Sequence, residues 1–195
     1  MKPQDLLDIL TTASRLKTTM RHCWTAAGRQ ESVADHSWRI ALMAMLLKDE
    51  EEFSQYDMDK VIEMCLIHDL GEAFTGDIPT FVKEAADEKT EAAYYEEWVR
   101  SFPERQREHW LQLLAEMKEL RTAEAKIFKC LDKLEALISH NESDLGTWLP
   151  LEYDLQYTYG RENMKDFAYF ITLREAVDAW TKDKIEKESG ELHKQ

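Results

Sequence analysis

The sequence predicts an all-α protein, and three observations support that prediction. Only 6 glycines and 4 prolines interrupt the 195 residues, so few positions force the backbone to turn. Long segments repeat apolar residues every three or four positions, which is the spacing of one helix face. Hydrophobic residues make up 44% and charged residues 33%, a composition typical of globular rather than disordered chains. This length suffices for one sizeable core, so we expect a single-domain helical bundle.

We expect one domain over residues 1–181, because no repeat, low-complexity block or linker divides the sequence. Residues 182–195 form a highly charged tail that should fray. Residues 15–31 lose the helical period and carry several basic side chains, so they predict a basic, irregular loop. A first helix precedes this loop, and we expect it to face the core through Leu6, Leu10 and Ala13.

The second and third helices have recognisable ends. Ser32 followed by Asp35 resembles a capping box and should start the second helix. Asp57 should cap the third helix, and Gly71 suits the position just after its last turn. Residues 72–86 predict a loop with one short helical turn after Pro79.

Apolar spacing predicts four further helices, centred on residues 95–102, 110–120, 122–138 and 170–180. Pro103 should separate the first two of these, and the segment 141–150 should end the third. The aromatic residues 151–163 fit either a loop or an extended piece, and both interpretations stay open.

The charge balance restricts the partners of the protein. The formal net charge is −14, and such an acidic surface repels a nucleic-acid backbone. A small phosphorylated substrate remains compatible, because a metal and a few local bases reverse the field inside one cleft. There is no signal-peptide core and no apolar run long enough to span a membrane, and the three cysteines form no CxxC pair. We therefore expect a cytoplasmic protein with no membrane partner.

One acidic segment, residues 65–77, dominates the chemistry of the sequence. The surrounding stretch from 61 to 82 contains no lysine or arginine but four acids, Glu63, Asp69, Glu72 and Asp77. Carboxylates at this density repel one another unless a cation lies among them. The segment therefore predicts half of a metal site.

Two polar residues elsewhere lie on apolar helix stripes and are candidates for the other half. His36 lies on the inner face of the second predicted helix, and Asp132 lies at the edge of the apolar stripe of the sixth. Alone, His36 is more often a hydrogen-bonded core histidine, and Asp132 is equally a partner of a lysine or a helix end. Together with the tandem pair His68 and Asp69, they favour a metal, because buried charges require a partner.

These residues resemble the H…HD…D signature of the HD-domain metal-dependent phosphohydrolases. The likeness is closest to the 5′-deoxynucleotidases of the YfbR and HDDC type, through the segments 31–37, 68–72 and 75–80. The matching residues span 15–138, which is the motif core of an HD-type helical bundle. The resemblance implies one divalent metal held by His36, His68, Asp69 and Asp132. Mixed imidazole and carboxylate ligands suit Mn, Fe, Co, Ni or Zn, and the spacing does not choose among them.

The resemblance also implies roles in catalysis and substrate binding. Glu72 would position or deprotonate the attacking water, and Asp77 would assist at the water network or at the sugar and leaving group. The candidate substrate-binding residues are Arg21, Trp24, Asp77, Thr80 and Lys83. The simpler interpretation of Arg21, Trp24 and Lys83 is ordinary protein surface.

The expected function is a metal-dependent 5′-nucleotidase that hydrolyses deoxynucleoside 5′-monophosphates to deoxynucleoside and phosphate. One alternative is an HD phosphohydrolase acting on a triphosphate, a cyclic dinucleotide or a guanosine alarmone. Another is a non-catalytic helical binding module. The resemblance implies a homodimer, and we expect a partner surface that includes Trp98, Trp110, Trp148 and Trp180. The base preference, the selectivity for deoxyribose over ribose and the physiological metal stay open.

Overall fold

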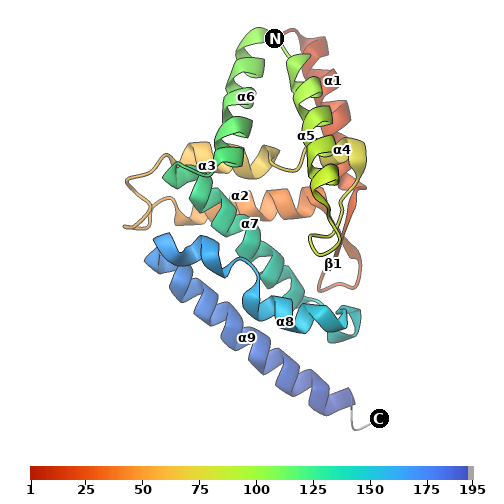
Figure 1. The fold of residues 1–195 in the computed structure, drawn as a ribbon, viewed down its shortest axis with the longest axis vertical. Helices are drawn as coiled ribbons and strands as arrows, with labels where there is room; N and C mark the ends of the chain where they lie inside the picture. The colour runs from red at the N-terminus through yellow and green to blue at the C-terminus, as the bar shows by residue number, and fades with distance from the viewer. Residues whose placement is uncertain (193–195) are drawn as a thin grey trace.

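The computed structural model describes residues 1–192, which are almost entirely helical (Figure 1). One small sheet joins two short strands near the N-terminus. The elements in chain order are α1 (Pro3–Ala13), η1 (Ser14–Lys17), β1 (Met20–Trp24), β2 (Gln30–Ser32), α2 (Val33–Leu47), α3 (Met58–Ile67), α4 (Glu72–Thr75), α5 (Ala85–Arg100), α6 (Glu104–Glu119), α7 (Ala123–Glu142), η2 (Leu145–Thr147), α8 (Pro150–Thr158), η3 (Arg161–Asp166) and α9 (Ala168–Leu192).

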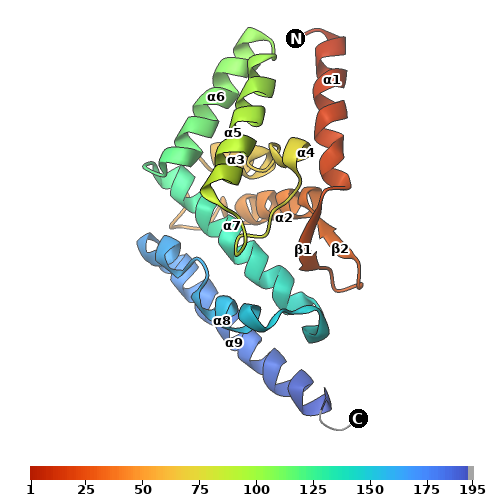
Figure 2. The same cartoon turned by 45° about the vertical axis from the view of Figure 1, so that its right-hand side comes forward.

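Helix α7 is the central element of the fold. It packs against α2 and α3 on one side and against α9 on the other, and the hairpin strand β1 also contacts it. Figures 1 and 2 show α7 crossing the middle of the molecule, with α8 and α9 below it and the α5–α6 pair rising above. The buried side chains of α2, α3 and α7 form one apolar core that includes Val33, Ile40, Val61, Met64, Ile127, Leu131 and Leu134. The polar side chains on these three helices therefore meet inside the molecule.

The basic segment 15–31 is ordered, and the prediction of an irregular loop was wrong. It forms the short 3-10 helix η1 and an antiparallel hairpin in which Met20 lies opposite Ser32 and Trp24 opposite Gln30. The turn between the strands includes Gly28 at a φ of 77°. A five-residue strand contains too few alternations to stand out from irregular sequence, so the hairpin left no clear pattern.

The predicted helix starts are confirmed, whereas the predicted end of α3 is wrong. The Ser32 Oγ accepts a hydrogen bond from the Asp35 amide at 3.2 Å, and Asp57 accepts one from the Lys60 amide at 3.0 Å. Helix α3 ends at Ile67, and Gly71 has an ordinary φ of −60° immediately before α4. Gly71 is needed instead for a close approach, because a Cβ there would lie 3.0 Å from the Cγ atom of Glu91.

Helix α1 and the tryptophans differ from their predicted roles. Leu6 and Leu10 are exposed, and the residues of α1 that pack against the core are Ile9 and Ala13. Trp98 and Trp110 pack edge to face against Phe102 within one subunit. Trp148 is also buried within the chain, so of the four tryptophans expected at a partner surface only Trp180 is exposed.

The C-terminal third is helical where the sequence left the conformation open. Residues 151–158 lie in α8 and residues 161–163 begin η3, and of the two residues between them only Tyr159 has an extended backbone. Helix α9 continues through Leu192, so the expected frayed tail begins as a continuation of that helix, with Thr181 and Lys184 buried. The last three residues of that tail, 193–195, lie outside the described part of the chain. Among residues 1–192, no helix combines the length and the apolar character that crossing a membrane requires.

Candidate metal centre and adjoining pocket

Four polar side chains from three helices meet in the core. His36 comes from α2, His68 and Asp69 follow the last residue of α3, and Asp132 comes from α7. One ligand atom of each of the first three lies within 4.8 Å of the others. The Nε2 atom of His36 lies 3.9 Å from an Asp69 oxygen and 3.3 Å from an Asp132 oxygen, while Nε2 of His68 lies 2.8 Å from Asp69. The fold thus brings together the four residues that the sequence predicted as metal ligands.

The two histidines present the chemistry that a metal requires. The Nδ1–H of His68 donates to the Cys65 carbonyl at 3.0 Å, and Nδ1 of His36 contacts the Glu135 carboxylate. Each ring therefore carries its hydrogen on Nδ1, which leaves the Nε2 lone pair facing the cluster. Both Nε2 atoms are buried without a hydrogen bond of normal geometry within residues 1–192. Since an unpaired buried polar atom is costly, two free imidazole nitrogens beside two carboxylates fit a divalent transition metal.

The charges of the cluster also favour a bound cation. Burial and the nearby Arg21 lower the pKa of His36, but Glu135 outweighs them and the pKa is raised to about 9. Burial raises the pKa of Asp69, but the neighbouring His68 outweighs burial and holds that pKa below its usual range. The site thus attracts a positive charge, which is either a proton or a metal ion.

Sequence reasoning missed Glu135, which supports the cluster from behind. It is fully buried, contacts His36, and accepts a hydrogen bond from the Nε of Arg39 at 2.7 Å. Arg21 lies 3.4 Å from the same carboxylate. Burial raises the pKa of Glu135, but His36 and Arg21 outweigh burial and lower it to about 2. A signal was present in the sequence, because Glu135 lies three positions after Asp132 and therefore on the same helix face.

Glu72 and Asp77 lie beside the cluster and are not among its closest atoms. Glu72 begins α4, is 5% exposed, and has one carboxylate oxygen buried without a hydrogen-bond partner in the described chain. Burial, followed by repulsion from Asp69 and Asp77, raises the pKa of Glu72 to about 10. Burial also raises the pKa of Asp77, although Arg21 opposes that shift. At that pKa the Glu72 carboxyl is protonated at neutral pH, and a divalent cation in the neighbouring cluster would lower the pKa toward the range of a general base.

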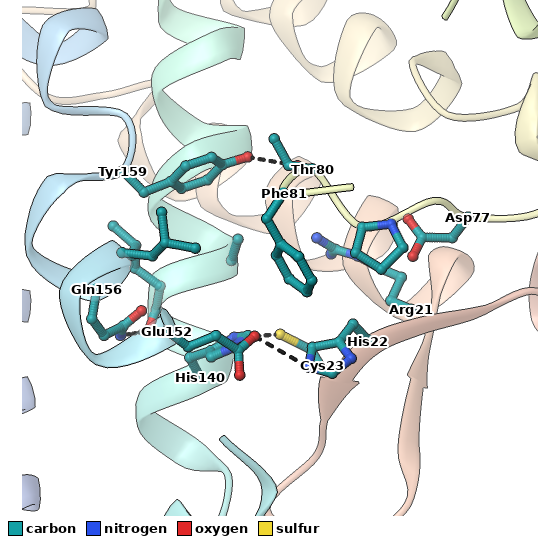
Figure 3. A pocket seen from close by; sticks show the side chains of 14 residues that line it. Arg21, His22, Cys23, Asp77, Thr80, Phe81, His140, Glu152, Gln156 and Tyr159 are labelled. Atoms are coloured by element: carbon teal, nitrogen blue, oxygen red, sulfur yellow. Dashed lines mark hydrogen bonds and ion pairs between the residues drawn. The ribbon is translucent and has the colours of Figure 1, made fainter. Parts of the chain in front are cut away.

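A pocket of about 260 Å³ opens next to this cluster, with Arg21 and Asp77 at one end (Figure 3). Its volume falls just below the roughly 300 Å³ at which pockets for drug-sized ligands begin. Of the predicted substrate residues, Arg21, Asp77 and Thr80 line it, and Trp24 and Lys83 do not. The Nζ atom of Lys83 instead pairs with Glu91 at 2.7 Å.

The sequence did not predict the remaining polar residues of the pocket wall. They come from β1, α7, α8 and the residue after α8, and they are His22, Cys23, His140, Glu152, Gln156 and Tyr159. Two parts of the chain that are far apart in the sequence, β1 and the α7–α8 region, thus close the pocket. Because α8 was left open as a loop or an extended piece, no sequence pattern placed its side chains beside those of β1.

Comparisons with known proteins agree with this geometry. The HD domain family matches residues 13–169. A human relative named 5′-deoxynucleotidase HDDC2 is 31% identical over 169 residues, covering 84% of this chain and 75% of its own length. The 5′-deoxynucleotidase hdd1 of Schizosaccharomyces pombe is 26% identical and covers 95% of this chain and 91% of its own. A crystal structure described as a predicted metal-dependent phosphohydrolase of Magnetospirillum magnetotacticum superimposes with a TM-score of 0.75, at 26% identity over 94% of this chain and 92% of that one.

The helical fold and the buried His and Asp cluster define a metal-dependent phosphohydrolase. The chain belongs to the HD-domain family.

Proposed function

We propose that this protein is a metal-dependent 5′-deoxynucleotidase that hydrolyses deoxynucleoside 5′-monophosphates to deoxynucleoside and phosphate. One observation carries the proposal. The four-residue cluster adjoins a pocket of about 260 Å³, and a partly buried arginine, Arg21, lies at the end of that pocket nearest the cluster. A phosphate at that end places a nucleoside in the pocket. The names of the human and fission yeast relatives support the same reaction.

In this proposal His36, His68, Asp69 and Asp132 hold one divalent ion of Mn, Fe, Co, Ni or Zn. When bound, that ion supplies positive charge that polarises the phosphoryl group and favours ionisation of water. Arg21 neutralises a second part of the phosphate charge. Although burial lowers its pKa, Glu135 and Glu31 outweigh burial, so the guanidinium stays charged. Phosphoryl transfer depends mainly on such positioning and neutralisation.

In this scheme Glu72 accepts and returns the proton. Its carboxylate takes a proton from the attacking water as the new P–O bond forms. The bond between phosphorus and the 5′ oxygen then breaks, and the same proton passes to the leaving nucleoside oxygen. Asp77 and Thr80 line the pocket next to Arg21 and face the sugar. Lys83 is close enough to lower the pKa of Glu72 and so adjusts the charge around that carboxylate, rather than binding substrate.

The pocket volume and the burial of Glu72 argue against two alternative functions. A cavity of about 260 Å³ suits one nucleoside better than a cyclic dinucleotide. A non-catalytic module has no use for a buried carboxylate such as Glu72 with an unpaired oxygen, because burying it costs folding free energy.

A phosphate-release assay of metal-loaded protein tests the proposal across nucleoside mono-, di- and triphosphates. We expect release from deoxynucleoside monophosphates, and the absence of release from every monophosphate would refute the reaction. Asp69→Ala should lose metal content relative to the wild type. Equal metal content in both proteins would refute this ligand assignment.

We further propose that the protein acts in the cytoplasm and as a homodimer. The acidic composition and the three free cysteines agree with a reducing compartment. Large apolar side chains on the outer face of α2, namely Trp38, Met45 and Leu46, are more than half exposed and offer a surface for a second copy.

A further inference from the structure

The end of the pocket away from Arg21 contains a glutamine whose side-chain amide has a fixed orientation. Gln156 lies on α8 and is 3% exposed. Its Nε2 donates to the Leu137 carbonyl at 2.8 Å and to Oδ1 of Asn141 at 3.1 Å, so both amide hydrogens are used. The Oε1 atom accepts no hydrogen bond from residues 1–188, and Gln156 lines the pocket. Its free acceptor is therefore available to a ligand.

A series of hydrogen bonds with fixed donors and acceptors determines whether the oxygen or the nitrogen of the Gln156 amide faces the pocket. The Nδ2 of Asn141 donates to the Val177 carbonyl at 3.2 Å, which requires Oδ1 of Asn141 to point at Gln156. The Thr181 hydroxyl lies 3.0 Å from that oxygen and also 3.0 Å from the Val177 carbonyl, so its one hydrogen serves either acceptor. An oxygen receives only donors, so the NH₂ group of Gln156 must point toward Asn141 and Oε1 must point away from it. Rotating the Gln156 amide by 180° would break its hydrogen bonds to the Leu137 carbonyl and to Oδ1 of Asn141.

Glu152 provides a second acceptor at the same end, one helical turn before Gln156. It is 4% exposed, and its two oxygens accept from Nε2 of His140 at 2.8 Å and from the Leu149 amide at 2.6 Å. Nδ1 of His140 lies 2.6 Å from the sulfur of Cys23, whose thiol burial keeps protonated by raising its pKa. Cys23 therefore donates to His140 and His140 donates to Glu152. Nε2 of His22 also lies 3.2 Å from the same Glu152 oxygen as His140. Burial raises the pKa of Glu152, but the hydrogen bonds from His140 and Leu149 outweigh burial and lower it, so the carboxylate keeps its negative charge.

The two ends of the pocket thus have opposite character. Arg21 lies at one end, whereas Glu152 and Gln156 lie across the cavity from it, with the ring of Phe81 between them in Figure 3. Phe81 also meets His22 edge to face with ring centroids 5.6 Å apart. An anionic phosphate held at the Arg21 end would leave the nucleobase next to Phe81 and facing two acceptors.

We propose that Gln156 and Glu152 form a base-reading wall that prefers nucleobases with an exocyclic amino group over thymine and uracil. The inference rests on the proposed function and deepens it by naming the preferred substrates. Adenine, cytosine and guanine each present an amino donor, whereas thymine and uracil present carbonyl acceptors at the corresponding position. A carbonyl that faces Oε1 of Gln156 leaves that oxygen without a donor, and such a mismatch discriminates strongly between substrates.

The test compares dCMP with dUMP, because these nucleotides share size and shape and differ only at the 4-position, amino against carbonyl, and at N3, which carries a hydrogen only in uracil. For metal-loaded wild type we expect kcat/KM for dCMP to exceed that for dUMP by roughly tenfold, the order expected for one well-placed base contact. In Gln156→Met, which keeps the side-chain length and removes the acceptor, the ratio should fall toward one. Thr158→Val, an exposed position on the same helix, should keep the wild-type ratio. Because each ratio comes from one preparation, a partly unfolded variant does not distort it.

A binding measurement separates this wall from the proposed reaction. Calorimetric titration of wild type with deoxycytidine and with deoxyuridine should give the tighter dissociation constant for deoxycytidine. Equal affinities, or equal kcat/KM for dCMP and dUMP in the wild type, would overturn the base-reading wall. A clear preference for deoxycytidine without hydrolysis of any monophosphate would support the wall and refute the nucleotidase activity.

Discussion

At the scale of single residues, the histidines of the cluster depend on what their other nitrogen contacts. His68 is oriented by a backbone carbonyl, which no substitution of a side chain removes. His36 is oriented by Glu135, which Arg39 and Arg21 hold in place in turn. A carboxylate behind a metal-binding histidine fixes its tautomer and raises its basicity. The contribution of Glu135 to metal binding can therefore be tested without touching a ligand.

We predict that Glu135→Gln weakens metal affinity by about 10- to 100-fold, the usual effect of losing such an outer carboxylate. The neutral amide keeps the shape of the side chain and loses the charge that favours the Nδ1–H form of His36. Competitive titration with a metal chelator measures the change. Glu142→Gln is the matched control, because Glu142 also pairs with Arg39 but lies at the surface and does not contact His36. Equal losses in both variants would show that Arg39, rather than the carboxylate behind His36, controls the site.

For Glu72→Gln we predict a fall in kcat of about 10²- to 10⁴-fold, the range typical of removing a general base. Metal content by elemental analysis should equal that of the wild type, because Glu72 lies outside the ligand cluster. The substitution replaces a buried carboxylate whose oxygen has no partner, so the free energy of unfolding should not decrease. Loss of metal together with activity would instead make Glu72 a ligand.

The sequence predicted that His36, His68, Asp69 and Asp132 come together, and it did not predict the far wall of the pocket, for a physical reason. His36, His68, Asp69 and Asp132 interrupt long apolar stripes, and a buried charge on such a stripe requires a partner. Glu152 and Gln156 lie on a nine-residue helix with little apolar periodicity. Their position depends on tertiary contacts with α7 and α9, and no local pattern in the sequence encodes those contacts.

At the scale of elements, one glycine sets the path between α8 and η3. Gly160 has a φ of 70°, and a Cβ there would lie 2.6 Å from the Cβ of Lys133 on α7. Gly28, in the hairpin turn, has a similar φ of 77° but nothing within 4 Å of the Cβ position. Substituting alanine at Gly28 tests the cost of backbone strain alone, whereas substituting alanine at Gly160 adds the cost of a steric clash.

We predict that Gly28→Ala lowers the free energy of unfolding by about 1–2 kcal/mol, the cost of a left-handed conformation for a residue with a Cβ. Gly160→Ala should cost more, because Lys133 belongs to the central helix and its Cβ cannot move without shifting α7. Urea denaturation followed by circular dichroism measures both. Equal losses would show that η3 moves away from α7 to admit the methyl group.

The hairpin and α1 show where element prediction failed. The strand β1 carries Arg21, His22 and Cys23 to the pocket, yet five residues give too short a pattern to identify. In α1 the predicted core contact of Ala13 is confirmed, but Leu6 and Leu10 are exposed and Ile9 packs against the core in their place. Helical spacing shows that a helix has an apolar face, and it does not show whether the same chain covers that face.

At the scale of the whole molecule, the structure has two apolar helix faces that the described part of the chain leaves uncovered. One is on α1, with Leu6, Leu7 and Leu10. The other is on α2, where Trp38 is 61% exposed and Leu46 is 66% exposed. Each copy of the protein carries a net charge of −14, so two copies repel each other and must associate through a surface poor in acids.

That requirement favours α2 as the surface of the proposed homodimer. No acidic residue occurs from Trp38 to Leu46, whereas α1 carries Asp5 and Asp8 between and beside its exposed leucines. Across a two-fold axis each surface meets itself, so the acids of α1 would face one another. Tryptophan is also the residue most enriched among the energetic centres of interfaces.

We therefore predict a dimer of the wild type by multi-angle light scattering at micromolar concentration, and a monomer for Trp38→Glu. Placing a carboxylate at the centre of the surface removes an apolar anchor and sets two like charges against each other, which should weaken association by at least about 30-fold. Leu7→Glu on α1 is the matched control and should remain a dimer. A monomeric Leu7→Glu beside a dimeric Trp38→Glu would move the interface to α1. A wild type that is monomeric at 100-fold higher concentration would exclude the homodimer itself.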